Sequence, residues 1–142
     1  MFTCDADCGE DRVREAVAAV FAAHGVLHAA VTVVFADDAD VSGVHGEFFD
    51  DPTPTDVMTF PMGGEGTADD PLTGEVMVGA DHARRVAEEL GRDAGEESLL
   101  YVVHGALHLC GLDDRTDEGR AAMRAAERSA LQSLGVVPHY FT

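Results

Sequence analysis

The sequence predicts one α+β domain over residues 1–142, in which a small mixed β-sheet packs with helices. Three observations lead to this fold class. Segments with apolar residues at helical spacing alternate with short segments rich in β-branched residues. A chain of 142 residues is long enough for one sizeable core. No internal repeat, linker or low-complexity segment divides it.

The first part of the chain is expected to form two helices and a strand. Residues 10–23 carry Val and Phe at helical spacing, which predicts an amphipathic helix. Residues 27–35 are rich in β-branched residues and predict a largely buried strand. A short helix is predicted over about 39–48, where neighbouring Asp residues offer caps. Residues 50–54 contain two Pro and predict a turn.

The middle of the chain is expected to form two strands and a helix. Alternation over residues 55–61 and the short apolar segment 74–79 predict the strands, and the Gly-rich residues 62–73 predict a loop between them. Asp81 is expected to cap a helix that Gly91 ends.

Two further helices complete the expected fold. The first lies within the stretch 96–115 and opens with Glu96 and Glu97, because acids suit the positive end of a helix dipole. The second covers about 117–134. Its expected core face consists of Met123, Ala126, Ala130 and Leu134.

The strongest functional signal is the pattern His104-x-x-x-His108-x-x-Gly111-x-x-Asp114. Residues four apart share a helix face, so the two His can bring two imidazole nitrogens to one ion. Gly111 suits a left-handed helix end, after which Asp114 or Asp113 can supply an oxygen. Three protein ligands with an open fourth position are typical of catalytic zinc, so we predict one zinc ion per chain on this central helix. The alternative is a buried helix whose two His are held by hydrogen bonds in the core.

The charge argues against tight, non-specific binding of nucleic acid. Asp and Glu number 27 against nine Lys plus Arg, all nine of them Arg, for a net charge of -18. Nucleic-acid binders usually gain much of their affinity from Lys and Arg. The densest basic feature is Arg115 together with a row on the last helix, Arg120, Arg124 and Arg128. The row is either a local basic site or a solvated face balanced by Glu118 and Glu127.

Composition favours a cytoplasmic protein that does not associate with a membrane. No apolar run reaches the roughly 18 residues that a membrane span needs, and no basic segment followed by an apolar one opens the chain. Three Cys cannot all pair, and there is no C-x-x-C. We expect three free thiols, with Cys110 packed as a small apolar residue.

Three segments together resemble one protein family. They are the motif from His104 to Asp114, Pro54-Thr55-Asp56-Val57-Met58-Thr59-Phe60-Pro61, and Gly74-Glu75-Val76. Their order and spacing resemble the YbeY family of bacterial ribosomal-RNA maturation factors, over nearly the whole chain. The resemblance implies a metal-dependent, single-strand-specific endoribonuclease with an α+β fold and zinc on the motif helix. It further implies a role in small-subunit ribosomal-RNA processing and ribosome quality control, with single-stranded or ribosomal RNA and small-subunit proteins as partners.

Two positions depart from the family pattern. The usual motif ends in a His where this chain has Asp114, and a carboxylate is a competent zinc ligand. Many members have an Arg where this chain has Phe49, so Arg115 or the Arg120 row would have to meet the phosphate. In the predicted site His104, His108 and Asp114 hold zinc, Arg115 stabilises the phosphate and Asp113 orients a ligand.

Two other functions compete with RNA hydrolysis. Metzincin peptidases share the ligand spacing but need a Glu directly after the first His, and here that position is Gly105. The other is a ribosome assembly factor whose metal mainly stiffens the fold. The acidic composition and the missing Arg favour this second alternative.

Overall fold

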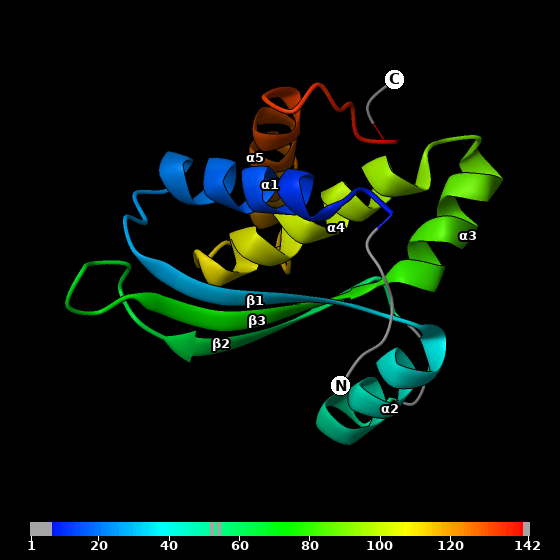
Figure 1. Ribbon diagram of the computed structural model, residues 1–142, viewed down its shortest axis with the longest axis horizontal. Coiled ribbons are helices and arrows are strands. Elements are labelled where there is room, and N and C mark those ends of the chain that lie inside the picture. The colour runs from blue at the N-terminus through cyan, green and yellow to red at the C-terminus, as the bar shows by residue number, and fades with distance from the viewer. Residues whose placement is uncertain (1–6, 52, 54, 141–142) are drawn as a thin grey trace.

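The computed structural model describes residues 7–51, 53 and 55–140. Within these residues the elements are α1 (Glu10–Ala23), β1 (Ala29–Ala36), α2 (Asp38–Phe49), β2 (Val57–Gly63), β3 (Leu72–Gly79), α3 (Ala80–Leu90), α4 (Ala94–Leu109) and α5 (Asp117–Gln132). The strands pair in the order β1-β3-β2, with β1 parallel and β2 antiparallel to β3. The predicted α+β class with a small mixed sheet is confirmed (Figure 1).

Helices cover the two faces of the sheet unequally. Figure 1 shows α1, α4 and α5 over one face, whereas α2 lies at one end of the other. Because successive strand residues point to opposite faces, the strands supply two cores. The larger core contains Phe35, Val76 and Val78, and the smaller one, which includes Val41 of α2, contains Met77.

The prediction that the first strand is largely buried was wrong. β1 is an edge strand, and among its residues only Phe35 and Ala36 are buried. Its β-branched residues suit strand geometry without burial on both faces. The strand also begins at Ala29, because the backbone N–H groups of Leu27 and His28 both donate to the carbonyl of Gly66, outside the ladder.

Several other boundaries differ from the predictions. β2 continues to Gly63 and β3 begins at Leu72, so the predicted loop shortens to residues 64–71. Asp81 does not cap α3, whose N-cap is Gly79. Instead, its carboxylate accepts a hydrogen bond of 2.8 Å from the backbone N–H of Asp38, at the start of α2. The predicted turn at 50–54 includes two positions outside the described residues.

α4 is the central helix and packs against α1, α3, α5, β2 and β3. It begins at Ala94, two residues before the predicted start, because the Asp93 side chain accepts the backbone N–H of Glu96 and caps the helix. Most of its residues are buried, Glu97 among them. Two partly exposed side chains, His104 and His108, interrupt the buried surface. The core therefore fixes the direction in which these imidazoles point.

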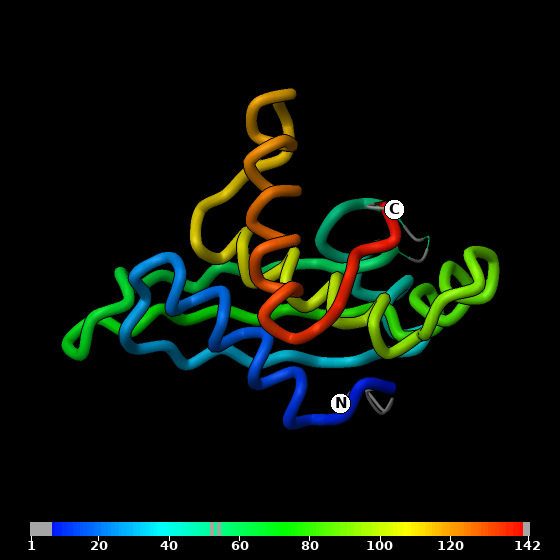
Figure 2. The backbone as a smooth tube through the Cα atoms, turned by 90° about the horizontal axis from the view of Figure 1, so that it is seen from above, coloured from blue at the N-terminus to red at the C-terminus, as the bar shows by residue number. Residues whose placement is uncertain are grey.

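The remaining sequence expectations concern the last helix, membranes and cysteines. α5 ends at Gln132 rather than 134, and residues 133–140 then run back across the molecule (Figure 2). Among the described residues, no helix is long and apolar enough to cross a membrane. Cys8 and Cys110 are free thiols, and Cys110 packs against the larger core as predicted. Cys4 lies outside the described residues.

Candidate metal centre

Two histidines on α4 face each other across one helical turn. The Nε2 atoms of His104 and His108 are 3.0 Å apart, and the ring centroids are 4.6 Å apart. The four-residue spacing places both rings on one face of the helix, as predicted. Their side chains are 23% and 27% exposed, so solvent reaches both.

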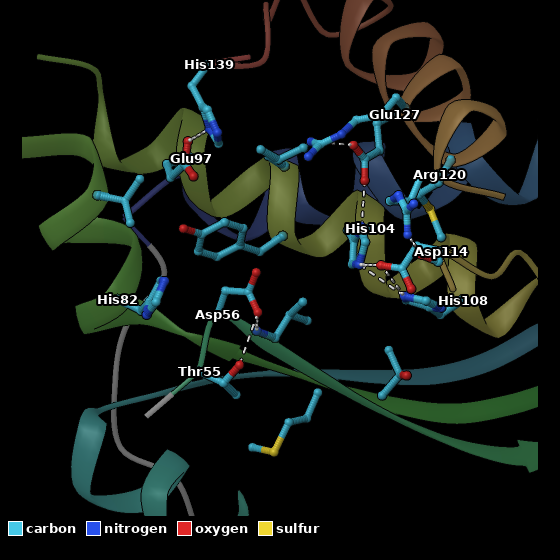
Figure 3. A pocket seen from close by; sticks show the side chains of 18 of the residues that line it. Thr55, Asp56, His82, Glu97, His104, His108, Asp114, Arg120, Glu127 and His139 are labelled. Carbon is cyan, nitrogen blue, oxygen red and sulfur yellow. Dashed lines mark hydrogen bonds and ion pairs between the residues drawn. The ribbon is translucent and has the colours of Figure 1, made fainter. Parts of the chain in front are cut away.

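The end of α4 brings a carboxylate to the same point. Two hydrogen bonds close the helix, from Gly111 N to the His108 carbonyl (3.0 Å) and from Leu112 N to the Leu107 carbonyl (3.1 Å). Gly111 has φ 97°, the left-handed conformation predicted for a helix end. The chain then turns back, and Asp114 Oδ2 lies 3.6 Å from His104 Nε2 and 3.9 Å from His108 Nε2 (Figure 3).

These three atoms are spaced for a single metal ion. All lie within 4.8 Å of one another. The circle through them, fixed by separations of 3.0, 3.6 and 3.9 Å, has a radius of about 2.1 Å, which matches Zn–N and Zn–O distances of roughly 2.0–2.2 Å. One ion can thus contact all three atoms without a large movement of the side chains.

The hydrogen bonds of the other ring nitrogens support the same conclusion. His104 Nδ1 lies 2.6 Å from Glu127 Oε2, and His108 Nδ1 lies 3.0 Å from the Leu112 carbonyl oxygen. Because a carboxylate and a carbonyl can only accept, both Nδ1 atoms carry the hydrogen. Two Nε2 lone pairs then face each other at 3.0 Å, which is repulsive unless a proton or a metal ion lies between them. Metal-bound His residues have this pattern of outer hydrogen bonds.

Glu127 is the buried partner of His104, so the alternative in which it balances a solvated face was wrong for this residue. Its side chain is 2% exposed. The Tyr140 hydroxyl donates to Oε1 at 2.5 Å, and Arg124 Nη1 lies 3.7 Å from the same oxygen. The Arg124 guanidinium also lies 3.8 Å from the centre of the Tyr140 ring. One signal was present in the sequence, because Glu127 falls on the apolar stripe of α5 one turn after Met123.

The buried carboxylate alters the protonation of its neighbours. Burial lowers the pKa of His104, but the hydrogen bond and charge of Glu127 outweigh burial, so the net pKa is raised. Burial, and then the hydrogen bond to Glu127, raise the pKa of Tyr140. Tyr140 therefore stays a hydrogen-bond donor at neutral pH. Because the pKa of His104 is raised, a proton binds its Nε2 more readily and competes there with a metal ion.

The three-residue cluster lies in the wall of a cavity of about 700 Å³. Figure 3 shows the cluster on one side and a second buried acid, Glu97, on the other. Glu97 Oε1 lies 3.0 Å from Nδ1 of His139, which belongs to the segment after α5. Burial and the negative charge of Glu97 raise the pKa of Tyr101. Sequence reasoning assigned Glu97 only to the helix dipole, although it shares a helical stripe with Tyr101 and His104.

The two residues predicted to assist catalysis lie outside this cavity wall. Asp113 Oδ1 accepts the backbone N–H of Arg115 at 2.6 Å, and the Arg115 side chain is 88% exposed. Their roles stay predictions that the geometry does not support. From the predicted basic row, Arg120 and Arg124 do line the cavity. Arg120 Nη1 also donates to the Asp114 carbonyl at 3.3 Å, which braces the turn that carries the carboxylate.

Gly105 packs against the sheet with no space for a side chain. A Cβ at this position would lie 2.5 Å from Val76 Cγ1 and 3.3 Å from Thr59 Cγ2. The position directly after His104 therefore cannot hold the glutamate that a metzincin-like peptidase needs.

The segment that begins at Thr55 also lines the cavity. Within it, Asp56 Oδ1 accepts the Val57 backbone N–H at 2.7 Å.

Two His on a central helix and one Asp in the turn after it face an open cavity, which defines a class of α+β proteins with an accessible candidate metal site. The family model described as Endoribonuclease YbeY matches residues 7–135. The chain therefore belongs to this family, and the resemblance seen in the sequence is confirmed.

Relatives from several bacteria carry the name Endoribonuclease YbeY. That of Rhodopirellula baltica is 38% identical over 125 residues, covering 86% of this chain and 62% of the relative. That of Chlamydia trachomatis serovar D is 40% identical over 106 residues, covering 73% of this chain and 66% of the relative. The chain thus spans just under two thirds of the length of these two relatives.

A solved structure supports the fold. The solution structure of TM1509 from Thermotoga maritima matches 93% of this chain and 87% of its own, with a TM-score of 0.62 and 21% sequence identity.

Proposed function

We propose that this chain is a single-domain, zinc-dependent endoribonuclease that hydrolyses single-stranded RNA in small-subunit ribosomal-RNA maturation and ribosome quality control. The observation that carries the proposal is the convergence of His104 Nε2, His108 Nε2 and Asp114 Oδ2 in the wall of an open cavity. Family membership and the names of the relatives support the reaction class.

The donor set favours zinc over magnesium or calcium. Two imidazole nitrogens and one carboxylate suit zinc, whereas magnesium and calcium prefer oxygen ligands alone. When bound, such an ion supplies Lewis acidity that activates water near neutral pH and offsets charge on a phosphodiester.

The residues around the cluster have separate tasks in this proposal. His104, His108 and Asp114 bind the ion. Glu127 holds the His104 ring in one orientation and one tautomer. Arg120 and Arg124 bring positive charge to the cavity wall, so they are better placed than the exposed Arg115 to meet a backbone phosphate.

A ribosome assembly role with a structural metal is the second candidate. The net charge of -18 favours it, because an acidic chain repels RNA. The two candidates differ in what removal of one ligand does, since a structural metal holds the fold together whereas a catalytic metal is needed only for the reaction.

RNA cleavage by the zinc-loaded protein tests the proposal. Labelled single-stranded RNA should be cut, the same sequence in a duplex should stay intact, and a chelator should stop the reaction. His108→Ala and Asp114→Ala should lose both cleavage and zinc while their circular dichroism spectra stay folded. His28→Ala is the matched control, because His28 is exposed and lies outside the cavity wall, and it should keep both properties.

Two outcomes would count against catalysis. A folded, zinc-loaded protein that leaves every single-stranded RNA intact would favour the assembly role. Unfolding of His108→Ala together with loss of zinc would assign the metal to the structure.

A further inference from the structure

The cavity has an exposed aromatic rim at the end of α2. Phe48 and Phe49 are adjacent in the last turn of this helix and are 61% and 51% exposed. Phe49 lines the cavity that contains the metal cluster. Exposed apolar surface beside a functional site is a common mark of ligand binding.

Neighbouring rings hold these two side chains in place. The Phe60 ring of β2 packs against the smaller core, and its centroid lies 5.4 Å from that of Phe48 and 6.0 Å from that of Phe49. The His45 ring lies 5.5 Å from that of Phe49, and His45 Nδ1 is 2.8 Å from the Thr53 carbonyl oxygen. Phe60 and His45 thus hold the two Phe side chains in place, while about half of each of these side chains stays exposed to solvent.

The basic side chains of the cavity lie away from the two Phe. Three exposed acids, Glu47, Asp50 and Asp51, lie next to the two Phe along the chain, so this rim disfavours phosphate. Arg120 and Arg124 face the same cavity from α5. A single RNA strand suits a cavity with two Arg on one side and aromatic rings on another, because it carries phosphates along its backbone and has unpaired bases with aromatic faces.

We propose that Phe49, supported by Phe48 and Phe60, is a stacking platform for an unpaired base of the RNA strand. The proposal rests on the proposed function for its substrate class and adds how the strand is held. Stacking on an aromatic ring does not require positive charge, which suits a chain with 27 acids and nine Arg. It also selects single strands, because bases in a duplex are already stacked and paired.

Binding to the full chain in the presence of a chelator tests the platform without cleavage. Fluorescence anisotropy is measured with a labelled single-stranded RNA and with an abasic strand of the same length. Phe49→Leu, which keeps an apolar side chain but removes the ring, should weaken RNA binding by roughly five- to a hundredfold, the effect of losing one stacked base. Binding of the abasic strand should not change. Phe49→Tyr keeps a ring and should bind RNA like the parent chain.

Leu27→Ala serves as the control, because Leu27 is 81% exposed and lies outside the cavity wall. It should leave RNA binding unchanged. An equal loss on RNA and on the abasic strand would overturn the platform, since Phe49 would then act on the backbone. Unchanged RNA binding by Phe49→Leu would also overturn the platform. The exposed Phe side chains would then be assigned to contact with a protein partner. Failure of the proposed function is distinguishable, because the parent chain would then still bind RNA in this test but would leave RNA intact in the cleavage test of the zinc-loaded protein.

Discussion

Glu127 is buried behind His104, where its carboxylate accepts hydrogen bonds from the His104 ring and the Tyr140 hydroxyl. Glu127→Gln keeps the shape of this side chain but removes its charge. We expect zinc affinity to fall about 10- to 100-fold, because a neutral amide holds the ring less firmly and makes it a weaker donor. Competition with a chromogenic zinc chelator measures the change.

A second readout separates positioning from a general loss of structure. The pKa of His104 in the metal-free chain should fall in Glu127→Gln, since the hydrogen bond and charge that raise it are lost. Titration followed by NMR reports this pKa. Glu118→Gln is the matched control, because it removes one acid from the exposed first turn of α5. Equal zinc affinity in the two variants would contradict the role of Glu127.

Residues whose geometry is local could be placed from the sequence. His104 and His108 share a face because of helical spacing, and Gly111 ends the helix because of its backbone freedom. Glu127 could not be assigned in the same way, since its position depends on how α5 packs against α4. Arg115 was predicted to meet the phosphate because it belongs to the densest basic feature and the chain lacks the upstream Arg of the family, but the turn after α4 directs this side chain into solvent.

At the scale of elements, Gly105 sets how closely α4 approaches the sheet. An added Cβ would lie 2.5 Å from Val76 Cγ1, with Val57 and Thr59 methyl carbons at 3.3 Å. Gly105→Ala should therefore destabilise the protein by about 1–3 kcal/mol, the usual cost of overpacking, although Ala is the better helix former. Urea unfolding measures the change in free energy.

Gly43→Ala is the matched control for this prediction. Gly43 lies within α2, and a Cβ there would meet nothing within 4 Å. Ala should stabilise this helix by about 0.5–1 kcal/mol, because it loses less backbone entropy on folding. The two substitutions are chemically identical, so opposite signs would identify the close contact as the cause. Stabilisation by both would contradict the tight packing of α4 on β3.

Element boundaries were predictable where one pattern decides them. The bounds of α1 agree with the prediction, because an amphipathic period and a closing His24-Gly25 define both ends. The burial of β1 was not predictable, since it depends on its place at the sheet edge. Asp81 has the residue type and position of a helix cap, yet tertiary packing of α2 beside α3 gives its carboxylate a different N–H partner.

At the scale of the whole molecule, the cavity combines parts from most of the chain. α4 and the turn after it supply the metal cluster, α5 supplies cations and a buried acid, and the end of α2 supplies aromatic rings. The sequence motif identified the first of these because its residues are close together. The others are brought to the cavity by the fold, so a linear pattern does not reveal their proximity.

The net charge of -18 should make the stability of the whole molecule depend on salt. Folding confines the acidic groups, and their mutual repulsion opposes the compact state. Raising chloride salt from 0.1 M to 1 M shortens the screening length from about 10 Å to about 3 Å, which weakens this repulsion.

Salt also weakens the favourable ion pairs, but the net effect should still be stabilising. The pairs of Arg84 with Asp7 and Arg85 with Asp38 are substantially exposed, and pairs of this kind contribute about 0–1 kcal/mol each. These pairs involve few of the 27 acidic residues, so the weakening of the repulsion among acids should outweigh the weakening of the ion pairs. We expect Tm to rise through a potassium chloride series at fixed pH, measured on metal-free protein so that zinc binding does not contribute. A Tm that falls over this range would show that the ion pairs outweigh the repulsion, contrary to this prediction.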